Sequence, residues 1–272
     1  MPLWNSSTIA ALSLLSLLHP SSRAQEQAPP PAVMENSGKP IVVSPRCAEE
    51  DLKWTGLACS PDEPCSLYLE VSAVESVGSR IFAAGNIHSS AVTLYSELLA
   101  SDDAGRTWRE AYERIPGAGL DRVEFIDSEI GWAVGQILFP LPQDPFLLAT
   151  ADGGKTWRRQ PVFGEERPGS IVEFGFINKT RGSLVFDRGP TGGRARYESY
   201  ESQDGGASWT LRDATSAPPR AKTGPPPLLR LRVDGPTQSF QIERRAGDRW
   251  TEVASFAVKL GACENPDPPN PR

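Results

Sequence analysis

An eight-residue pattern that occurs three times constrains the fold of this chain more than any other feature. The copies are SDDAGRTW, TADGGKTW and SQDGGASW, and they begin at residues 101, 150 and 202. A repeat at this period indicates a chain built from similar supersecondary units. The residues that recur at the same offsets are Ser101, Asp103, Gly105 and Trp108, then Thr150, Asp152, Gly154 and Trp157, then Ser202, Asp204, Gly206 and Trp209.

Each octet belongs to a longer unit of roughly fifty residues, the size of a propeller blade. In one copy, four segments rich in Val, Ile, Phe and Leu follow one another between Leu120 and Val162: LDRVEFID, IGWAVGQIL, DPFLLATADGG and KTWRRQPV. Short β-prone segments separated by Gly and Asp are typical of antiparallel strands joined by hairpins. The sequence therefore predicts an all-β chain, a β-propeller of about four blades with four antiparallel strands each.

The fourth unit is incomplete. Its segments PLLRLRVD, TQSFQIERR and RWTEVASFAV supply three strands, and in ERRAGDRW the residues Gly247 and Trp250 keep their places while Arg245 replaces the aspartate. We expect residues 40–44 (PIVVS) to supply the missing strand by pairing across the chain ends. Closing the ring in this way would cover sheet edges that otherwise invite aggregation.

The octet has a physical reason to occur between two strands. Aspartate accepts hydrogen bonds from turn amides, and glycine tolerates the positive φ that tight turns require. The tryptophan can then bury a large ring against a neighbouring sheet. Because the same chemistry recurs around the predicted ring, the octets are interpreted as structural, and no catalytic residue is assigned.

The three octets resemble the Asp-box, or BNR repeat, whose pattern is S/T-x-D-x-G-x-T/S-W. This pattern is found in sialidases, certain glycoside hydrolases, sortilin-type receptors and photosystem II stability/assembly factor-like propellers. The box spacing, with GWAVGQI ahead of one box, is most similar to the last group. The resemblance covers about residues 66–258 and implies structural boxes in hairpins away from the central axis. It says little about function, because one scaffold can host many functions.

The two ends of the chain differ in composition from the repeat region. The apolar run Ile9–Leu18 is too short to span a membrane, and Ser22 and Ala24 form a small-x-small site, so residues 1–24 are predicted to be a secretory signal peptide. A buried N-terminal helix is the alternative. Residues 25–40 are expected to be a Pro-rich linker, residues 41–263 the propeller and residues 264–272 a disordered tail. The chain is therefore expected to be exported, periplasmic or extracellular, without a membrane span.

Four cysteines remain after this cleavage, and an even number in an exported chain favours disulfides. Cys59 and Cys65 flank the turn-rich SPDEP and are expected to pair locally, which leaves Cys47 to pair with Cys263. Zinc is the competing interpretation, but no C-x-x-C spacing occurs and neither histidine lies near a cysteine. No metal and no cofactor are predicted.

Charge is unevenly distributed along the chain. Residues 1–150 carry 9 basic and 19 acidic side chains, whereas the remainder carries a net charge of +4 within a total of −6. The predicted partner is another protein, with a glycan as the alternative; no basic run with interleaved aromatic residues points to nucleic acid. Arg230, Arg232 and Arg245 in the fourth unit are candidate binding residues for an acidic partner. Decay of a terminal repeat is the alternative explanation for Arg245.

A sialidase or another glycoside hydrolase on the same fold is the enzymatic alternative. Arg114, Ile115 and Pro116 spell the Arg-Ile-Pro motif of sialidases, but the triplet follows a box instead of preceding the boxes. A Tyr–Glu nucleophile pair would have to come from the five tyrosines Tyr68, Tyr95, Tyr112, Tyr197 and Tyr200. The carboxylates of one predicted strand and its turn, Asp121, Glu124, Asp127 and Glu129, do not separate into an acid and a base.

Two proline-rich inserts, FPLPQDP (139–145) and APPRAKTGPPP (217–227), interrupt the predicted blades. Stiff, exposed loops on a rigid scaffold are common recognition sites, although they can also simply bridge strands. The functional prediction from the sequence is therefore an exported, non-catalytic propeller that serves as an interaction or assembly scaffold. The alternative is a carbohydrate-binding protein or a glycosidase.

Overall fold

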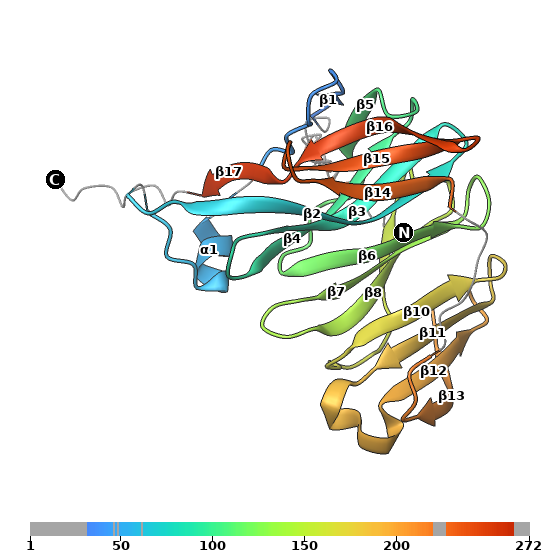
Figure 1. Ribbon diagram of the computed structural model, residues 1–272. Coiled ribbons are helices and arrows are strands. Elements are labelled where there is room, and N and C mark those ends of the chain that lie inside the picture. The colour runs from blue at the N-terminus through green and yellow to red at the C-terminus, as the bar shows by residue number, and fades with distance from the viewer. Residues whose placement is uncertain (1–31, 46, 48, 61, 220–226, 264–272) are drawn as a thin grey trace, which may run out of the picture. The chain divides into compact units, whose positions relative to one another are not determined.

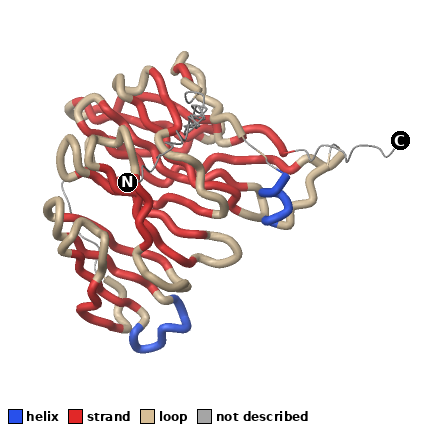
Figure 2. The backbone as a smooth tube through the Cα atoms, turned by 180° about the vertical axis from the view of Figure 1, so that it is seen from behind, coloured by secondary structure: helices blue, strands red, loops and turns tan. Residues whose placement is uncertain are grey.

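The computed structural model describes residues 32–45, 47, 49–60, 62–219 and 227–263. The predicted signal peptide, the predicted tail and residues 25–31 of the predicted linker lie outside this part of the chain. Strands dominate the described residues, as Figure 2 shows, and the all-β prediction is confirmed. The helical elements described are a short α-helix, α1 (Glu49–Thr55), and a 3-10 helix, η1 (Gly189–Ala195).

The chain is a β-propeller whose blades are four antiparallel sheets (Figure 1). The first blade consists of β2 (Cys65–Val77), β3 (Arg80–His88), β4 (Thr93–Ser101) and β5 (Thr107–Glu110). Two end segments extend this blade to six strands, because β17 (Lys259–Cys263) pairs with β2 and β1 (Met34–Glu35) pairs with β5. The C-terminal strand thus joins the first blade.

The second and third blades have the four strands that the repeat predicted. The second consists of β6 (Ala118–Phe125), β7 (Gly131–Ile137), β8 (Gln143–Thr150) and β9 (Arg158–Pro161). The third consists of β10 (Ser170–Phe176), β11 (Gly182–Asp187), β12 (Tyr197–Ser202) and β13 (Thr210–Thr215). In both, consecutive strands are neighbours in the sheet, so each blade is a simple meander.

The fourth blade has three strands, β14 (Leu229–Asp234), β15 (Ser239–Ala246) and β16 (Arg249–Ala257). The expected fourth strand, residues 40–44, is present only as a single parallel bridge between Ile41 and Phe256. The Ile41 amide donates to the Ser255 carbonyl over 2.7 Å, and Ile41 accepts from the Ala257 amide over 2.9 Å. The N-terminal segment therefore does reach this blade, but it contributes one bridge and not a strand.

Part of the expected linker also belongs to the propeller edge. Met34 and Glu35 pair with β5, and the Asn36 side-chain amide donates to the carbonyls of Gly105 (3.0 Å) and Val253 (2.8 Å). These hydrogen bonds tie the segment to both the first and the fourth blade. The described end of the linker is thus ordered by backbone and amide contacts that composition alone does not reveal.

Three clusters of buried apolar side chains join neighbouring blades. One lies between the fourth and first blades, the second between the first and second blades, and the third between the second and third blades. Among the described residues, no such cluster joins the third blade to the fourth. The blades therefore follow one another in the order fourth, first, second, third.

Candidate functional site

The turns of the three octets share one hydrogen-bond pattern. In the second octet, Asp152 Oδ1 accepts from the amides of Lys155 and Thr156, both at 3.0 Å, while Oδ2 accepts from the Thr156 hydroxyl at 2.6 Å. The Thr150 hydroxyl donates to Asp152 over 2.9 Å and accepts from the Gly154 amide. The equivalent bonds form around Asp103, and all but the first amide bond form around Asp204. Both carboxylate oxygens of each aspartate thus accept hydrogen bonds that hold a turn.

These hydrogen bonds also fix the charge state of the aspartates. Donation from the Thr156 hydroxyl and amide lowers the pKa of Asp152 to about 2. For Asp103, desolvation acts in the opposite direction, but donation from the Thr107 amide and hydroxyl prevails and the pKa again falls to about 2. A carboxylate that stays ionised far below neutral pH is a poor general acid.

The octet glycines are required by the neighbouring blade as well as by the turn. Gly105, Gly154 and Gly206 all have φ between 80° and 97°. A Cβ on them would meet Val253 of the fourth blade, Phe82 of the first and Leu147 of the second, respectively. Each octet turn therefore presses on the preceding blade.

The octet tryptophans pack at the same junctions. Trp108 lies edge-on to Phe256 of the fourth blade, with their ring centroids 5.0 Å apart. Trp157 lies edge-on to Phe82 of the first blade, with a centroid separation of 5.8 Å. Trp209 instead contacts Phe176 of its own blade at 6.0 Å, and Phe176 stacks on Trp132 of the second blade at 3.7 Å. The octets thus connect blades to one another.

The degenerate fourth octet differs at this point. Gly247 keeps a positive φ of 63°, but a Cβ placed on it would meet no atom within 4 Å. No preceding blade presses on this turn, so the packing constraint that holds the other octets to their pattern is absent. Arg245 stands where the aspartate would be, and its Nε donates to the Gly247 carbonyl over 3.2 Å.

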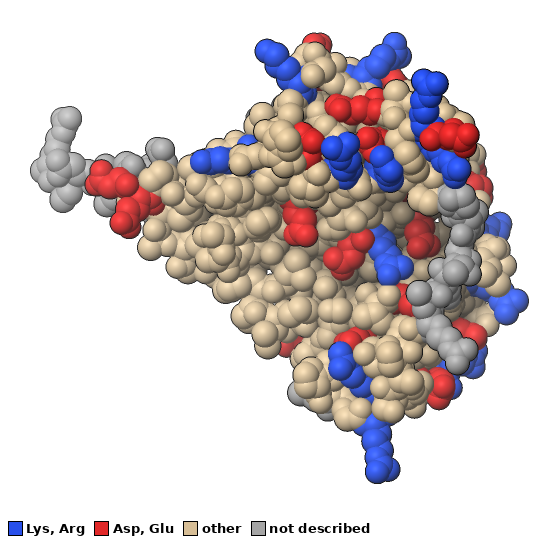
Figure 3. All heavy atoms as spheres, in the orientation of Figure 1, with Lys and Arg blue, Asp and Glu red and all other residues tan. Residues whose placement is uncertain are grey.

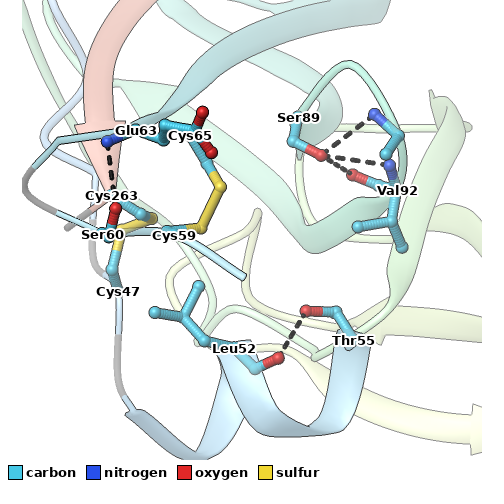
Figure 4. The surroundings of a disulfide bond; sticks show 11 residues. Cys47, Leu52, Thr55, Cys59, Ser60, Glu63, Cys65, Ser89, Val92 and Cys263 are labelled. Atoms are coloured by element: carbon cyan, nitrogen blue, oxygen red, sulfur yellow. Dashed lines mark hydrogen bonds between the residues drawn. A yellow bond between two sulfur atoms is a disulfide. The ribbon is translucent and has the colours of Figure 1, made fainter. Parts of the chain in front are cut away.

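The cysteines pair as the sequence predicted (Figure 4). Cys59 is bonded to Cys65, six positions away, and Cys47 to Cys263, 216 positions away. The second bond joins the two ends of the propeller. Among the described residues there is no free cysteine and no group of His, Cys, Asp and Glu arranged to hold a metal ion.

The Arg-Ile-Pro triplet lies in the loop after β5, and its arginine forms ion pairs within the chain. Arg114 is buried and forms ion pairs with Glu97 (2.7 Å) and Glu110 (3.0 Å), and it also donates to the Ser44 carbonyl. Its guanidinium therefore stabilises the first blade and the N-terminal segment. It does not present a binding surface for the carboxylate of a substrate.

A Tyr–Glu pair does exist in the third blade. Tyr200 donates to Glu198 over 2.6 Å and accepts from Arg167 over 2.7 Å, and Arg167 and Arg188 both pair with Glu198. Desolvation, with the hydrogen bond to Glu198, raises the pKa of Tyr200 to about 12, so its hydroxyl stays protonated. Arg167 also lies over the Phe163 ring at 4.6 Å. The alternation in ARYESYES placed these residues in a strand, but nothing in it indicated Arg167.

The carboxylates of the second blade serve separate purposes. Asp127 accepts from the amides of Glu129 and Ile130 in the β6–β7 turn, and these bonds lower its pKa. Asp121 on β6 has a raised pKa, because desolvation disfavours its charge and Glu70 adds to the effect. No acid–base pair emerges from this group.

The candidate binding arginines are partly neutralised within the chain. Arg230 forms an ion pair with Glu243 over 2.5 Å, while Arg232 pairs with Asp234 over 3.3 Å and approaches Glu243 at 3.9 Å. Arg230 also lies over the Trp250 ring at 4.4 Å. Figure 3 accordingly shows basic and acidic side chains side by side over this blade. Binding of an acidic partner here stays a prediction.

The proline-rich connection between β7 and β8 lines parts of two cavities. Leu138, Phe139 and Pro140 line a cavity of about 410 Å³ together with Glu70, Asn86, His88 and residues 89–93. Leu141 and Pro142 line an apolar cavity of about 320 Å³ with Pro168, Gly169 and Ser170 and with residues 187–190. Leu141, which lines the second cavity, is 65% exposed. Most of the other insert, at 220–226, lies outside the described residues.

We term residues 138–142 the recognition loop. The loop is anchored at its Phe139 end, where Trp54 of α1 lies edge-on at 5.3 Å. Trp54 also occupies the space that a Cβ on Gly117 would need. The loop thus packs on the N-terminal segment, a contact that no pattern in the sequence predicts.

No family model matches the chain, and no curated protein matches its sequence. Among solved structures it is similar to YCF48 bound to a D1 peptide, at 18% identity and a TM-score of 0.37, over 72% of this chain and 55% of that one. It is also similar to YCF48 from Cyanidioschyzon merolae, at 17% identity and a TM-score of 0.36, over 69% of this chain and 56% of that one. This chain spans little more than half the length of those chains, and similarity at this level carries no information about ligands.

Proposed function

We propose that this chain is an exported, non-catalytic Asp-box propeller that holds a partner protein at the recognition loop. The observation that carries this proposal is the exposed Leu141, which lines an apolar cavity with Pro142 and Pro168 on a loop joining two strands of one blade. A concave surface lined mainly by apolar side chains is the default candidate for a binding site.

Several features support the parts of this proposal. The common hydrogen-bond pattern of the three octets supports the Asp-box assignment and a structural role for the boxes. The two disulfides support an oxidising compartment, and with the apolar run at residues 9–18 they support export. In the described part of the chain, no helix has the length and apolarity to cross a bilayer.

The commitment of Arg114 and Tyr200 to internal pairs argues against sialidase chemistry. An acid–base or nucleophilic mechanism needs groups that reach the substrate in a reactive protonation state. Here Arg114 is paired with the carboxylate of Glu97, and the raised pKa of Tyr200 keeps its hydroxyl protonated. A glycosidase on this chain would need other residues, and the carboxylates of the second blade do not supply them.

In the experiment, the full chain is used to capture its partner protein from a native extract. Recovery of the partner by the wild type is compared with recovery by Leu141→Asp. A matched control is Ile177→Asp, because Ile177 is also an exposed apolar residue but lies on the β10–β11 turn. The proposal expects that Leu141→Asp loses the partner and Ile177→Asp retains it. A parallel glycan array with hydrolysis assays separates the alternatives: turnover would contradict the proposal, and glycan binding without turnover would favour a lectin.

A further inference from the structure

The polar cavity on one side of the recognition loop has an unusual balance of hydrogen-bonding groups. Its floor is one face of the β2–β3 pair, where Glu70 lies opposite Asn86 and His88 follows two residues along β3. Its walls are Leu138, Phe139 and Pro140 on one side and the 89–93 turn on the other. The side chains with polar atoms along the floor present acceptors and no cation.

Glu70 is the charged acceptor. Its Oε2 accepts from the Asn86 side-chain amide over 3.0 Å, and no arginine or lysine of the described chain forms an ion pair with it. The side chain is exposed to the cavity. A carboxylate without a cationic partner, in a concave site, attracts positive charge.

Asn86 is the second acceptor. The residue is 5% exposed, and its Oδ1 has no hydrogen-bond partner. Because its Nδ2 donates to Glu70, the orientation of the amide is fixed. A buried polar atom without a partner is costly, and a ligand that donates a hydrogen bond to it would recover that cost.

His88 is the third. Its Nδ1 lies 2.8 Å from the Ser89 carbonyl, which can only accept, so Nδ1 carries the hydrogen. In the neutral ring, Nε2 is then an acceptor. The turn beside it is rigid, because the Ser89 hydroxyl accepts from the amides of Ala91 and Val92, as Figure 4 shows.

A primary ammonium group matches this set. It carries a positive charge and three donors and has no acceptor. Its methylene stem suits a wall made of Leu138, Phe139, Pro140 and Val92. A carboxylic or phosphate ligand would instead face Glu70 with a like charge.

We propose that this cavity binds an alkylammonium group, namely a lysine side chain of the protein held at the recognition loop. This inference rests on the proposed function, because Leu138, Phe139 and Pro140, which line the cavity, belong to the same loop as Leu141. Glu70 pairs with the ammonium, Asn86 Oδ1 and His88 Nε2 accept its remaining hydrogens, and the loop covers the stem.

The test is a titration of the full, oxidised chain with Nα-acetyl-lysine methylamide. Binding is monitored by the NMR shifts of the backbone amides of residues 89–93, Leu138 and Phe139. The same blocked derivatives of norleucine and arginine, and free butylamine, serve as comparison ligands. The variants are Glu70→Gln, which keeps an acceptor for Asn86, and Glu252→Gln, an exposed glutamate of β16, as the control.

The lysine derivative is expected to shift these amides saturably and the norleucine derivative is not. Glu70→Gln should raise the Kd by about tenfold or more, since it removes a charge-assisted bond, and Glu252→Gln should leave it unchanged. Equal binding of norleucine, tighter binding of arginine, or an unchanged Kd in Glu70→Gln would overturn the ammonium site. Binding of butylamine without the lysine derivative would overturn the polypeptide source. Either failure is distinct from failure of the proposed function, which is decided by partner capture with Leu141→Asp.

Discussion

Cys65 and Cys263 lie directly opposite each other on β2 and β17, yet each forms its disulfide with a different cysteine. Strand pairing alone already brings the C-terminal strand to the first blade. The Cys47–Cys263 bond adds the N-terminal segment, so three parts of the chain meet at one edge. The short Cys59–Cys65 bond closes only a local loop at the same place.

The two disulfides should therefore differ in their contribution to stability. Replacing Cys47 and Cys263 by serine should lower the free energy of unfolding by about 2–5 kcal/mol, because the bond closes a loop of 216 positions. Replacing Cys59 and Cys65 should cost less, since that loop spans six positions. Denaturant unfolding of both double variants without reductant measures this, and equal losses would contradict the end-to-end role of the longer bond.

The octet turn predicts a second stability effect. Asp152→Ala removes four hydrogen bonds that the carboxylate accepts, from the amides of Lys155 and Thr156 and from the hydroxyls of Thr156 and Thr150, and should lower the free energy of unfolding by about 1–2 kcal/mol. Asp248→Ala, at an exposed aspartate of the β15–β16 turn, is the control and should change stability little. Partner binding by Asp152→Ala should persist wherever the variant is folded. Loss of binding with an unchanged melting curve would mean that the box itself is the binding site.

The low pKa values of the octet aspartates also predict a pH dependence. The folded pKa of Asp103 and Asp152 is about 2, below the ordinary value of 3.8, so both contribute stability that is complete above about pH 4 and is lost as the pH falls towards 2. Asp152→Asn should flatten the fall of the melting temperature between pH 4 and pH 2. A variant with the same slope as wild type would show that the folded pKa is not lowered by these bonds.

Arg114 provides a test of the buried ion pair. Arg114→Ala removes the ion pair with the buried Glu97 and should lower the free energy of unfolding by about 3–5 kcal/mol. Arg106→Ala, which removes an exposed arginine of the first octet turn, should cost less than about 1 kcal/mol. Thermal unfolding compares the two, and a stable Arg114→Ala variant with lost ligand binding would restore the arginine as a binding residue.

Most of the fold could be predicted from the repeat, because the octet and its flanking β-prone segments determine turns and strands through local interactions. Turn chemistry predicted the role of Asp152, and spacing predicted four-stranded second and third blades as well as the disulfide pairs. The pairing of β17 with β2 and the single bridge of Ile41 depend on contacts between distant segments. Period and propensity do not encode such contacts.

The candidate site was less accessible to sequence reasoning. The sequence predicts FPLPQDP to be an exposed loop, but the polar cavity beside it is also lined by Glu70 and Asn86 from another blade, and its Phe139 contacts Trp54 of α1. The sequence marks Arg245 as a candidate binding residue, whereas in the structure its Nε donates to the carbonyl of Gly247 in the same turn. Arg230 and Arg232 likewise face Glu243, whose position across the β14–β15 pair becomes visible only with the register.

The central claim is that the partner protein contacts the recognition loop and not the octet hairpins. It is tested most directly by placing a photo-crosslinking residue at Leu141 or at Lys155, an exposed position in the second octet, in the full chain with its native partner. We expect a crosslinked adduct from position 141 and no adduct from position 155. An adduct from position 155 with none from position 141 would contradict it.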